Sequence, residues 1–218
     1  MFFNLLLVSN LALLVSSASY YDNHIIKHAP EGFNSVYERK FAYYGGMESD
    51  GFGKAVAVYQ DTMIVGACFE DVNGPQSGNA HIFALDNSNR GWYLQDVLVR
   101  NNTKSYDYFG WSVALHQNWA LVGAWQNDAG GDKAGAAYFY NRQVDGHYIY
   151  WNQSQTVVGN EGDMMGISLA IGQGLTSVFI GAPGISNNGL VSVGGVYVYA
   201  LSDNEWNLVQ VLKPYNGR

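Results

Sequence analysis

Three copies of one apolar pattern run along the sequence, and this repetition constrains the fold more than any other feature. The clearest copy, FGWSVALHQNWALVGAW, runs from Phe109 to Trp125. Related copies run from Phe52 to Cys68 and from Met165 to Pro183. The glycines at the second position of the three copies are 57 and 56 residues apart. Self-similarity at such a period is typical of repeat proteins, in which each repeat is one supersecondary unit.

Each copy continues with two further strand-like segments at matching offsets. A glycine opens the first of them, which gives Gly78–Phe83, Gly135–Tyr140 and Gly194–Tyr199. A tryptophan opens the second, at Trp92, Trp151 and Trp206. Gly, Asn and Asp separate the segments, and these residues favour turns. Each repeat is therefore predicted to form four short strands, as in a propeller blade.

Large and small residues alternate within the first strand of each repeat. Successive side chains of a strand point to opposite faces of the sheet. In the second repeat the large face holds Phe109, Trp111, Val113 and Leu115, and the small face holds Gly110, Ser112 and Ala114. The first and third repeats show the same division, with Lys54 as an exception. Sheets that converge on an axis need this division, because the large face of one blade fits the small face of the next.

These motifs resemble the FG-GAP repeat of integrin alpha-subunit β-propellers and of many secreted proteins. The resemblance rests on the Phe-Gly that opens the first strand, on Gly181-Ala182-Pro183 at the end of the second, and on the segments that follow. It covers about residues 50 to 213. The sequence departs from the pattern at Cys68 and Trp125, which replace Pro, and at Met165, which replaces Phe. The resemblance implies extracellular ligand binding.

The predicted fold is all-β, a partial β-propeller of three four-stranded FG-GAP blades plus an N-terminal strand. The blades are assigned to residues 50–106, 107–162 and 163–218, and the strand, Tyr37–Phe41, lies in an N-terminal segment of residues 19–49. Propellers usually close with four to eight blades. Three blades therefore indicate a fragment, a shortened paralogue, or an open arc whose ends are covered by association.

Residues 1–18 have the features of a secretory signal peptide. They contain no charged side chain, carry an apolar run from Leu5 to Val15, and end in Ser16-Ser17-Ala18. An uncleaved N-terminal anchor or a buried helix is the alternative. We expect a secreted or extracellular-surface protein without a membrane span after cleavage. The sequons at Asn101 and Asn152 are then candidate glycosylation sites.

Composition and spacing argue against several other functions. The net charge of −7 disfavours nucleic-acid binding, which needs clustered Lys and Arg. Cys68 is the only cysteine, so it is either a buried thiol or a site of intermolecular pairing. The connections between first and second strands are too short and too poor in carboxylates for the calcium loop of the integrin repeats. Asp71-Val72-Asn73-Gly74 resembles part of such a loop but lacks the other ligands.

No catalytic, metal or cofactor site is predicted, and the chain is not expected to be an enzyme. His81 occupies the position of Tyr138 and Tyr197 in the other repeats, which favours a scaffold role. One aspartate precedes each first strand at the same offset, and turn capping explains all three, Asp50, Asp107 and Asp163.

Candidate binding residues lie in the long connections. If the strands of a blade run in sequence from axis to rim, the loops between strands two and three and those between blades emerge on one face. Loops presented by a rigid scaffold carry binding residues, and exposed aromatics beside carboxylates and amides suit a sugar or a protein hot spot. The candidates are Tyr43, Tyr44, Asp71, Tyr106, Tyr108, Trp125, Asn127 and Asp128. Alternatively, Trp125 only fills the axis in place of the family's Pro.

The sequence thus predicts a secreted, N-glycosylated binding or adhesion module for an extracellular protein or glycan. Self-association through open blade ends is a further expectation. Two alternatives stay open. One is an accessory propeller of a carbohydrate-active or lipid-hydrolysing enzyme, for whose catalytic part this chain has no room. The other is a purely structural remnant.

Overall fold

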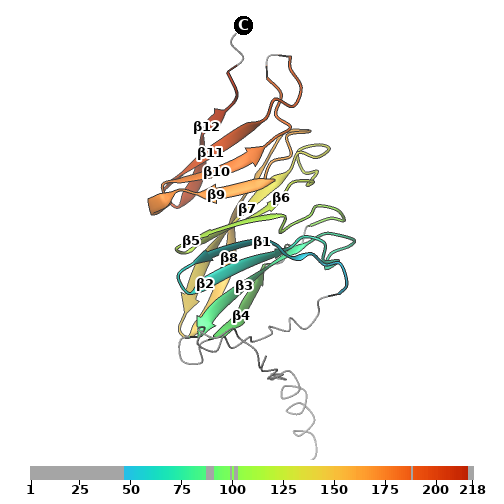
Figure 1. The fold of residues 1–218 in the computed structure, drawn as a ribbon. Helices are drawn as coiled ribbons and strands as arrows, with labels where there is room; N and C mark the ends of the chain where they lie inside the picture. The colour runs from blue at the N-terminus through green and yellow to red at the C-terminus, as the bar shows by residue number, and fades with distance from the viewer. Residues whose placement is uncertain (1–46, 87–90, 99, 101–102, 188, 216–218) are drawn as a thin grey trace, which may run out of the picture. The chain divides into compact units, whose positions relative to one another are not determined.

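The fold is taken from a computed structural model that describes residues 47–86, 91–98, 100, 103–187 and 189–215. These residues form three four-stranded antiparallel sheets, each with its strands in sequence order (Figure 1). The predicted all-β partial propeller of three blades is confirmed. The predicted signal peptide, the strand at Tyr37–Phe41, and residues Tyr43, Tyr44 and Asn101 lie outside the described residues.

Each repeat supplies one sheet. The first consists of β1 (Phe52–Tyr59), β2 (Thr62–Ala67), β3 (Asn79–Asp86) and β4 (Gly91–Leu98). The second consists of β5 (Ser112–His116), β6 (Trp119–Ala124), β7 (Ala136–Asp145) and β8 (Tyr148–Val158). The third consists of β9 (Ser168–Ile171), β10 (Ser177–Ala182), β11 (Gly195–Ser202) and β12 (Glu205–Leu212), with the 3-10 helix η1 (Gln173–Leu175) between β9 and β10.

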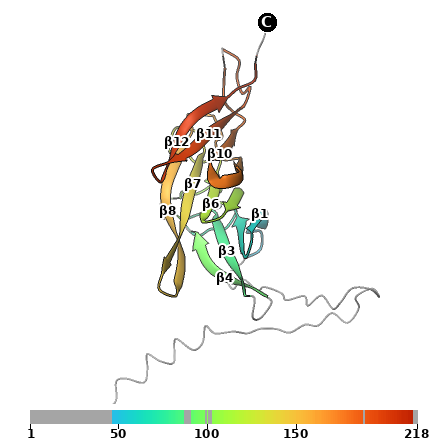
Figure 2. The same ribbon diagram turned by 90° about the vertical axis from the view of Figure 1, so that its left-hand side faces the viewer.

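The sheets follow one another with their first strands adjacent, so that β5 contacts both β1 and β9 (Figure 1). The longest hairpin is formed by β7 and β8, of 10 and 11 residues, and its tip stands apart from the other strands at the lower left of Figure 2. Tyr148, at the turn of this hairpin, is 80% exposed. That turn lies at the opposite end of the strands from the long connections.

Two apolar cores fill the spaces between the sheets, and they follow the predicted alternation. Val113 and Leu115, from the large face of β5, pack in the first core with Ala55 and Ala57 of β1. Ala114, from the small face of β5, packs in the second core, to which Leu169 and Ile171 of β9 also belong. The large face of each later sheet therefore meets the small face of the sheet before it.

Glycines at the ends of β2 and β6 allow this close approach. A Cβ atom on Gly66 would lie 2.0 Å from the carbonyl oxygen of Gly110, and one on Gly123 would lie 2.0 Å from that of Gly166. Real Cβ atoms do not approach backbone oxygens so closely. Only glycine fits at these two positions without moving the adjacent sheet.

The outer strands are joined as well. Asp96 Oδ2, on β4, accepts a hydrogen bond of 2.8 Å from the backbone N–H of Trp151 on β8. At the next joint Gln155 binds the backbone of Trp206 twice: its Oε1 accepts from the N–H at 2.9 Å, and its Nε2 donates to the carbonyl at 2.7 Å. Residues four positions after the repeat tryptophan thus connect successive blades at the rim, and the three sheets are fixed relative to one another.

Candidate functional site

The long connections pair with one another at the joints between sheets. Tyr106 donates its backbone N–H to Pro75 O at 2.8 Å, and Tyr108 donates to Gln76 O at 3.2 Å. At the second joint Met164 donates to Lys133 O at 2.9 Å in the same manner. Each β2–β3-type loop is therefore held against the connection that enters the next blade. The two classes of long loop lie together, as the strand order predicts.

Four aromatic rings gather on this loop face at the first joint. Tyr108 stacks on Trp125 with centroids 5.9 Å apart and an interplanar angle of 22°. Trp111 meets Trp125 edge-on at 5.5 Å. Phe69, which follows β2 of the neighbouring blade, lies 5.7 Å from Tyr108 and 6.3 Å from Trp111. We call Phe69, Tyr108, Trp111 and Trp125 the aromatic cluster.

A cation belongs to the same surface. Lys54, on β1, places its Nζ 4.1 Å from the centroid of the Trp111 ring. The lysine is exposed, whereas the four rings of the aromatic cluster are half-buried. The indole N–H of Trp125 has no hydrogen-bond acceptor among the described residues. The surface thus offers ring faces and a positive charge together, which suits a sugar, a carboxylate or the side chains of a protein partner.

Of the two joints between the described sheets, only the first carries the aromatic cluster. In the third repeat Met164, Ile167 and Pro183 stand where the second has Tyr108, Trp111 and Trp125. The backbone is nevertheless the same, since φ is 56° at Tyr108 and 53° at Met164. The aromatic residues are therefore additions to a shared scaffold, and the scaffold does not require them.

The polar side chains among the predicted ligand-binding residues form hydrogen bonds with other groups of the protein. Asp71 Oδ1 accepts from the N–H of Gln76 at 2.7 Å, and Asp128 Oδ1 accepts from that of Lys133 at 2.9 Å. Asn127 is buried and donates to Asp107 Oδ2 at 3.0 Å. Asp71 and Asp128 are exposed, as is Tyr106, which is 51% exposed. Among the predicted ligand-binding residues that the structure describes, Tyr108 and Trp125 are the two whose rings stack on each other.

The aspartates before the first strands cap turns, as predicted. Each accepts a hydrogen bond from the backbone N–H three residues earlier. The donors are Met47 for Asp50, Lys104 for Asp107 at 2.8 Å, and Asn160 for Asp163 at 2.9 Å. Burial raises the pKa of Asp107, while the hydrogen bonds from Lys104 and Asn127 act in the opposite direction. Asp163 also accepts from the hydroxyl of Tyr197 at 2.6 Å.

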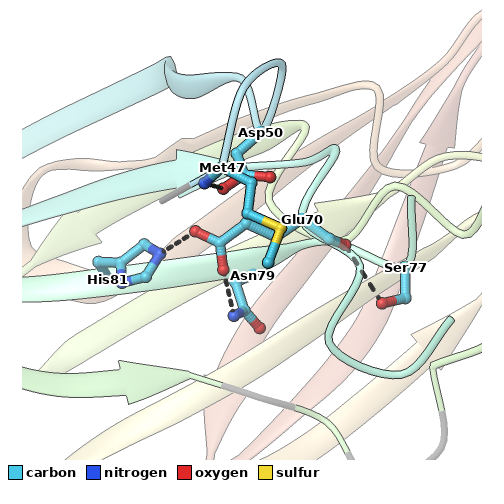
Figure 3. Close-up of polar contacts among 6 residues, drawn as sticks. All are labelled: Met47, Asp50, Glu70, Ser77, Asn79 and His81. Atoms are coloured by element: carbon cyan, nitrogen blue, oxygen red, sulfur yellow. Dashed lines mark hydrogen bonds and ion pairs between the residues drawn. The ribbon is translucent and has the colours of Figure 1, made fainter. Parts of the chain in front are cut away.

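A buried polar cluster in the first sheet was not anticipated. Figure 3 shows Glu70 between His81 and Asn79, with His81 Nε2 2.8 Å from Glu70 Oε1 and Asn79 Nδ2 2.6 Å from Glu70 Oε2. Ser77 also contacts the backbone oxygen of Glu70, at 3.4 Å. Glu70, His81 and Asn79 are at most 4% exposed. The repeats give no signal for the cluster, because Asn127 and Ile185 occupy the position of Glu70 in the other copies.

Across the described residues no group of three His, Cys, Asp or Glu side chains could hold a metal ion. No helix in this part of the chain is long and apolar enough to cross a membrane. The sequon residue Asn152 is exposed on β8, the outer strand of the second sheet.

Two solved structures show some likeness to the chain. Sqt1 from Chaetomium thermophilum aligns with a TM-score of 0.47 and 16% identity over 78% of this chain and 37% of that one. A putative 6-phosphogluconolactonase from Bacteroides uniformis aligns with a TM-score of 0.36 and 9% identity, over 75% and 57% of the two chains. The chain thus spans less than two thirds of the length of either structure.

The sequence comparisons bear on the repeats themselves. The search of curated proteins gave no match. The FG-GAP repeat family matches residues 38–83 and 92–140; the first range contains β1, β2 and part of β3, and the second contains most of β4, all of β5 and β6, and the start of β7. The third sheet repeats the strand order and the joint geometry of the first two. The chain is therefore an FG-GAP repeat protein.

Proposed function

We propose that this protein is a secreted, N-glycosylated binding or adhesion module that recognises an extracellular protein or glycan through the loops of one face. The observation that carries the proposal is the aromatic cluster with Lys54 beside it. Its rings come from two neighbouring blades whose sheets are fixed by shared cores and by hydrogen bonds at the rim. A half-exposed set of rings on a rigid support loses little conformational entropy on binding.

The chemistry of the surface favours a ligand with apolar and negative parts. Ring faces of Trp and Tyr pack against the C–H faces of sugars and against apolar side chains, and Lys54 adds a positive charge at the edge. Aromatic residues near the centre of an interface supply most of its binding energy. Tyr106 and Asp128, both exposed, lie on the same loops and extend the surface.

The binding proposal is tested with purified variants on glycan and protein arrays. Trp125→Ala and Tyr108→Ala should each weaken binding by about 30-fold, the effect of losing a hot-spot ring. Lys54→Gln, at an exposed position that does not endanger the fold, should weaken it less. Tyr148→Ala is the matched aromatic control, because Tyr148 lies at the β7–β8 turn, at the opposite end of the strands from the aromatic cluster. This variant should bind as the parent does.

Two results would contradict the proposal. An equal loss of binding affinity in Tyr148→Ala and Trp125→Ala would mean that the binding site lies elsewhere. Full binding by Trp125→Ala with an unchanged far-UV spectrum would mean that the aromatic cluster is not part of the binding site. Secretion is tested separately, by expression from Met1 in a eukaryotic host. The medium should contain a chain whose mass falls on treatment with an N-glycosidase and falls less for Asn152→Gln. An intracellular chain of unmodified mass would contradict the proposed secretion and glycosylation.

A further inference from the structure

The third sheet, at one end of the row of sheets in Figure 1, has one face without a neighbouring sheet in the part of the chain that the structure describes. Its other face packs on the second sheet, through residues such as Ile180. On the open side Phe179 of β10 and Leu212 of β12 are 37% and 42% exposed. Their counterparts in the second sheet, Leu121 and Val157, are 0% and 9% exposed. The third sheet therefore exposes the face that the second sheet buries in a joint.

The strand register makes this side of the sheet one continuous surface. Residues that are directly opposite one another on adjacent strands share a face. Phe179 lies opposite Ala170 and Val198, and Gly181 lies opposite Ser168 and Val196. With the β12 partners added, the set that we call the open face is Ser168, Ala170, Phe179, Gly181, Val196, Val198, Gln210 and Leu212. Apart from Ser168 and Gln210, these residues are apolar or glycine.

The third sheet is almost free of charged side chains. β9, β10 and β11 contain none, and β12 contains one, Glu205, as its first residue. The first sheet, by comparison, carries Lys54, Asp86 and Asp96 among others. The chain has a net charge of −7, so two copies repel each other in most orientations. Contact through the open face avoids like charges and removes an exposed apolar surface from water.

The open face also combines large and small residues in the way that contact with a copy of itself requires. Phe179 carries a large ring, and Gly181, two residues further along β10, carries no side chain. A Cβ on Gly181 would meet only atoms of Ser168 within 3.6 Å, whereas a Cβ on its counterpart Gly123 would lie 2.0 Å from the Gly166 carbonyl oxygen of the next sheet. An interface with two-fold symmetry brings the same patch of both copies together, so that patch must supply both the large and the small member of each contact.

A head-to-tail contact fits the structure less well. It would need the large face of a first sheet, in which Val65 and Phe83 are already only 3% and 4% exposed. Each copy offers one open face on its third sheet, so two copies cover each other's open faces and association stops at the dimer. The charge and the relief of the open face therefore both favour a second copy of this chain, in the same orientation, as its partner.

We propose that two copies of this chain associate through the open faces of their third sheets, related by a two-fold axis. Each Phe179 then lies over Gly181 of the other copy, and each Ala170 lies over Ser168. Sheets that face one another in this way pack about 10 Å apart. On the binding function proposed above, the dimer carries two aromatic clusters and so binds a surface with repeated ligands more tightly than one copy does.

Sedimentation equilibrium of the full chain, expressed from Met1 in a eukaryotic host, tests this inference. At micromolar concentration the parent chain should have twice the mass that it has in urea. Ala170→Glu and Ala170→Lys each place like charges in the two-fold contact and should weaken dimerisation by about 100-fold or more. Ala170 is exposed, so the far-UV spectrum should be unchanged. Val144→Glu is the control, because Val144 is 61% exposed on the β7–β8 hairpin, outside the third sheet; it should stay dimeric.

Mixing the two variants tests the two-fold arrangement. A heterodimer of Ala170→Glu and Ala170→Lys brings opposite charges together, so the 1:1 mixture should form dimers at concentrations where neither variant does so alone. A head-to-tail contact would show no such recovery, because each joint would pair one substituted face with a first sheet; a mixture that stays monomeric would therefore contradict the proposal. A monomeric parent chain would overturn it and would mean that a different partner covers the open face. Dimers unaffected by both substitutions, or mass that grows steadily with concentration, would also overturn it.

Discussion

Glu70 has buried polar partners, whereas Asn127 and Ile185 stand at its position in the other repeats. Its two carboxylate oxygens contact His81 and Asn79, and all three side chains are almost fully buried. Glu70→Ala should therefore lower the free energy of unfolding by about 1–3 kcal/mol or more, since it leaves buried polar groups without their acceptor. Urea unfolding measures the change. Glu48→Ala, at an exposed position, is the control; equal small effects of both substitutions would show that the contacts contribute little.

Cys68 offers a second test at the same scale. The side chain is fully buried, and this burial raises the pKa of the thiol from its ordinary 9.0 to about 11. The native thiol should therefore stay protonated at pH 8 and react slowly with iodoacetamide, whereas the urea-unfolded chain should react fast. Between pH 9 and 11 the native state binds the proton more tightly than the unfolded state, so stability should fall as pH rises through this window. Rapid labelling of the native chain would contradict the burial.

The roles of some residues could be predicted from the sequence and those of others could not, and the difference has a physical cause. Turn capping by Asp107 was predicted, because its hydrogen bond goes to a residue only three positions away. Lys54 is only an exception to the alternation in the sequence, and its place over the Trp111 ring becomes visible only when two blades are packed together. Glu70 was missed for the same reason: its partner, His81, lies 11 residues away on another strand, and the other repeats do not contain the pair.

At the scale of the strand and the sheet, the sequence predicted the architecture well. Alternating large and small residues fix which face of β5 meets each neighbour, because a strand places successive side chains on opposite faces. Ala57 and Val113 accordingly lie in one core and Ala114 in the other. The lengths of β7 and β8 could not be predicted in this way, since their hairpin extends beyond the repeat pattern and its exposed residues carry no periodic signal.

The joint glycines provide the test at this scale. Gly123→Ala would place a methyl group 2.0 Å from the Gly166 carbonyl, so the third sheet must move away from the second. We expect a loss of about 1–3 kcal/mol, as for other overpacked cores. Gly181→Ala meets only the Ser168 hydroxyl, a side chain that can rotate, and should cost the isolated chain less. Thermal unfolding of dilute samples compares the two. Equal stability of Gly123→Ala and the parent would refute the close approach of the sheets.

For the whole molecule, the position of the candidate site could be predicted better than its contents. Strand order alone places the β2–β3 loop beside the connection into the next blade, and the hydrogen bond from Tyr108 to Gln76 shows that they lie together. The sequence could not separate side chains that hold the loops, such as Asn127, from those that present a surface, such as Trp125. That separation depends on burial and on hydrogen-bond partners, which arise only when the blades are assembled.

The same loops lead to a prediction about divalent ions. The carboxylates of Asp71 and Asp128 accept hydrogen bonds from N–H groups of their own loops, so the loop geometry is maintained by protein donors without an ion. Removing calcium with a chelator should therefore leave the thermal midpoint of the chain unchanged, and adding calcium chloride should not raise it. Scanning fluorimetry in both buffers, with a calcium-dependent protein as positive control, makes the comparison. For a single domain of this size 1 kcal/mol corresponds to about 2–4 °C, so a fall of that size or more on chelation would mean that an ion completes these loops.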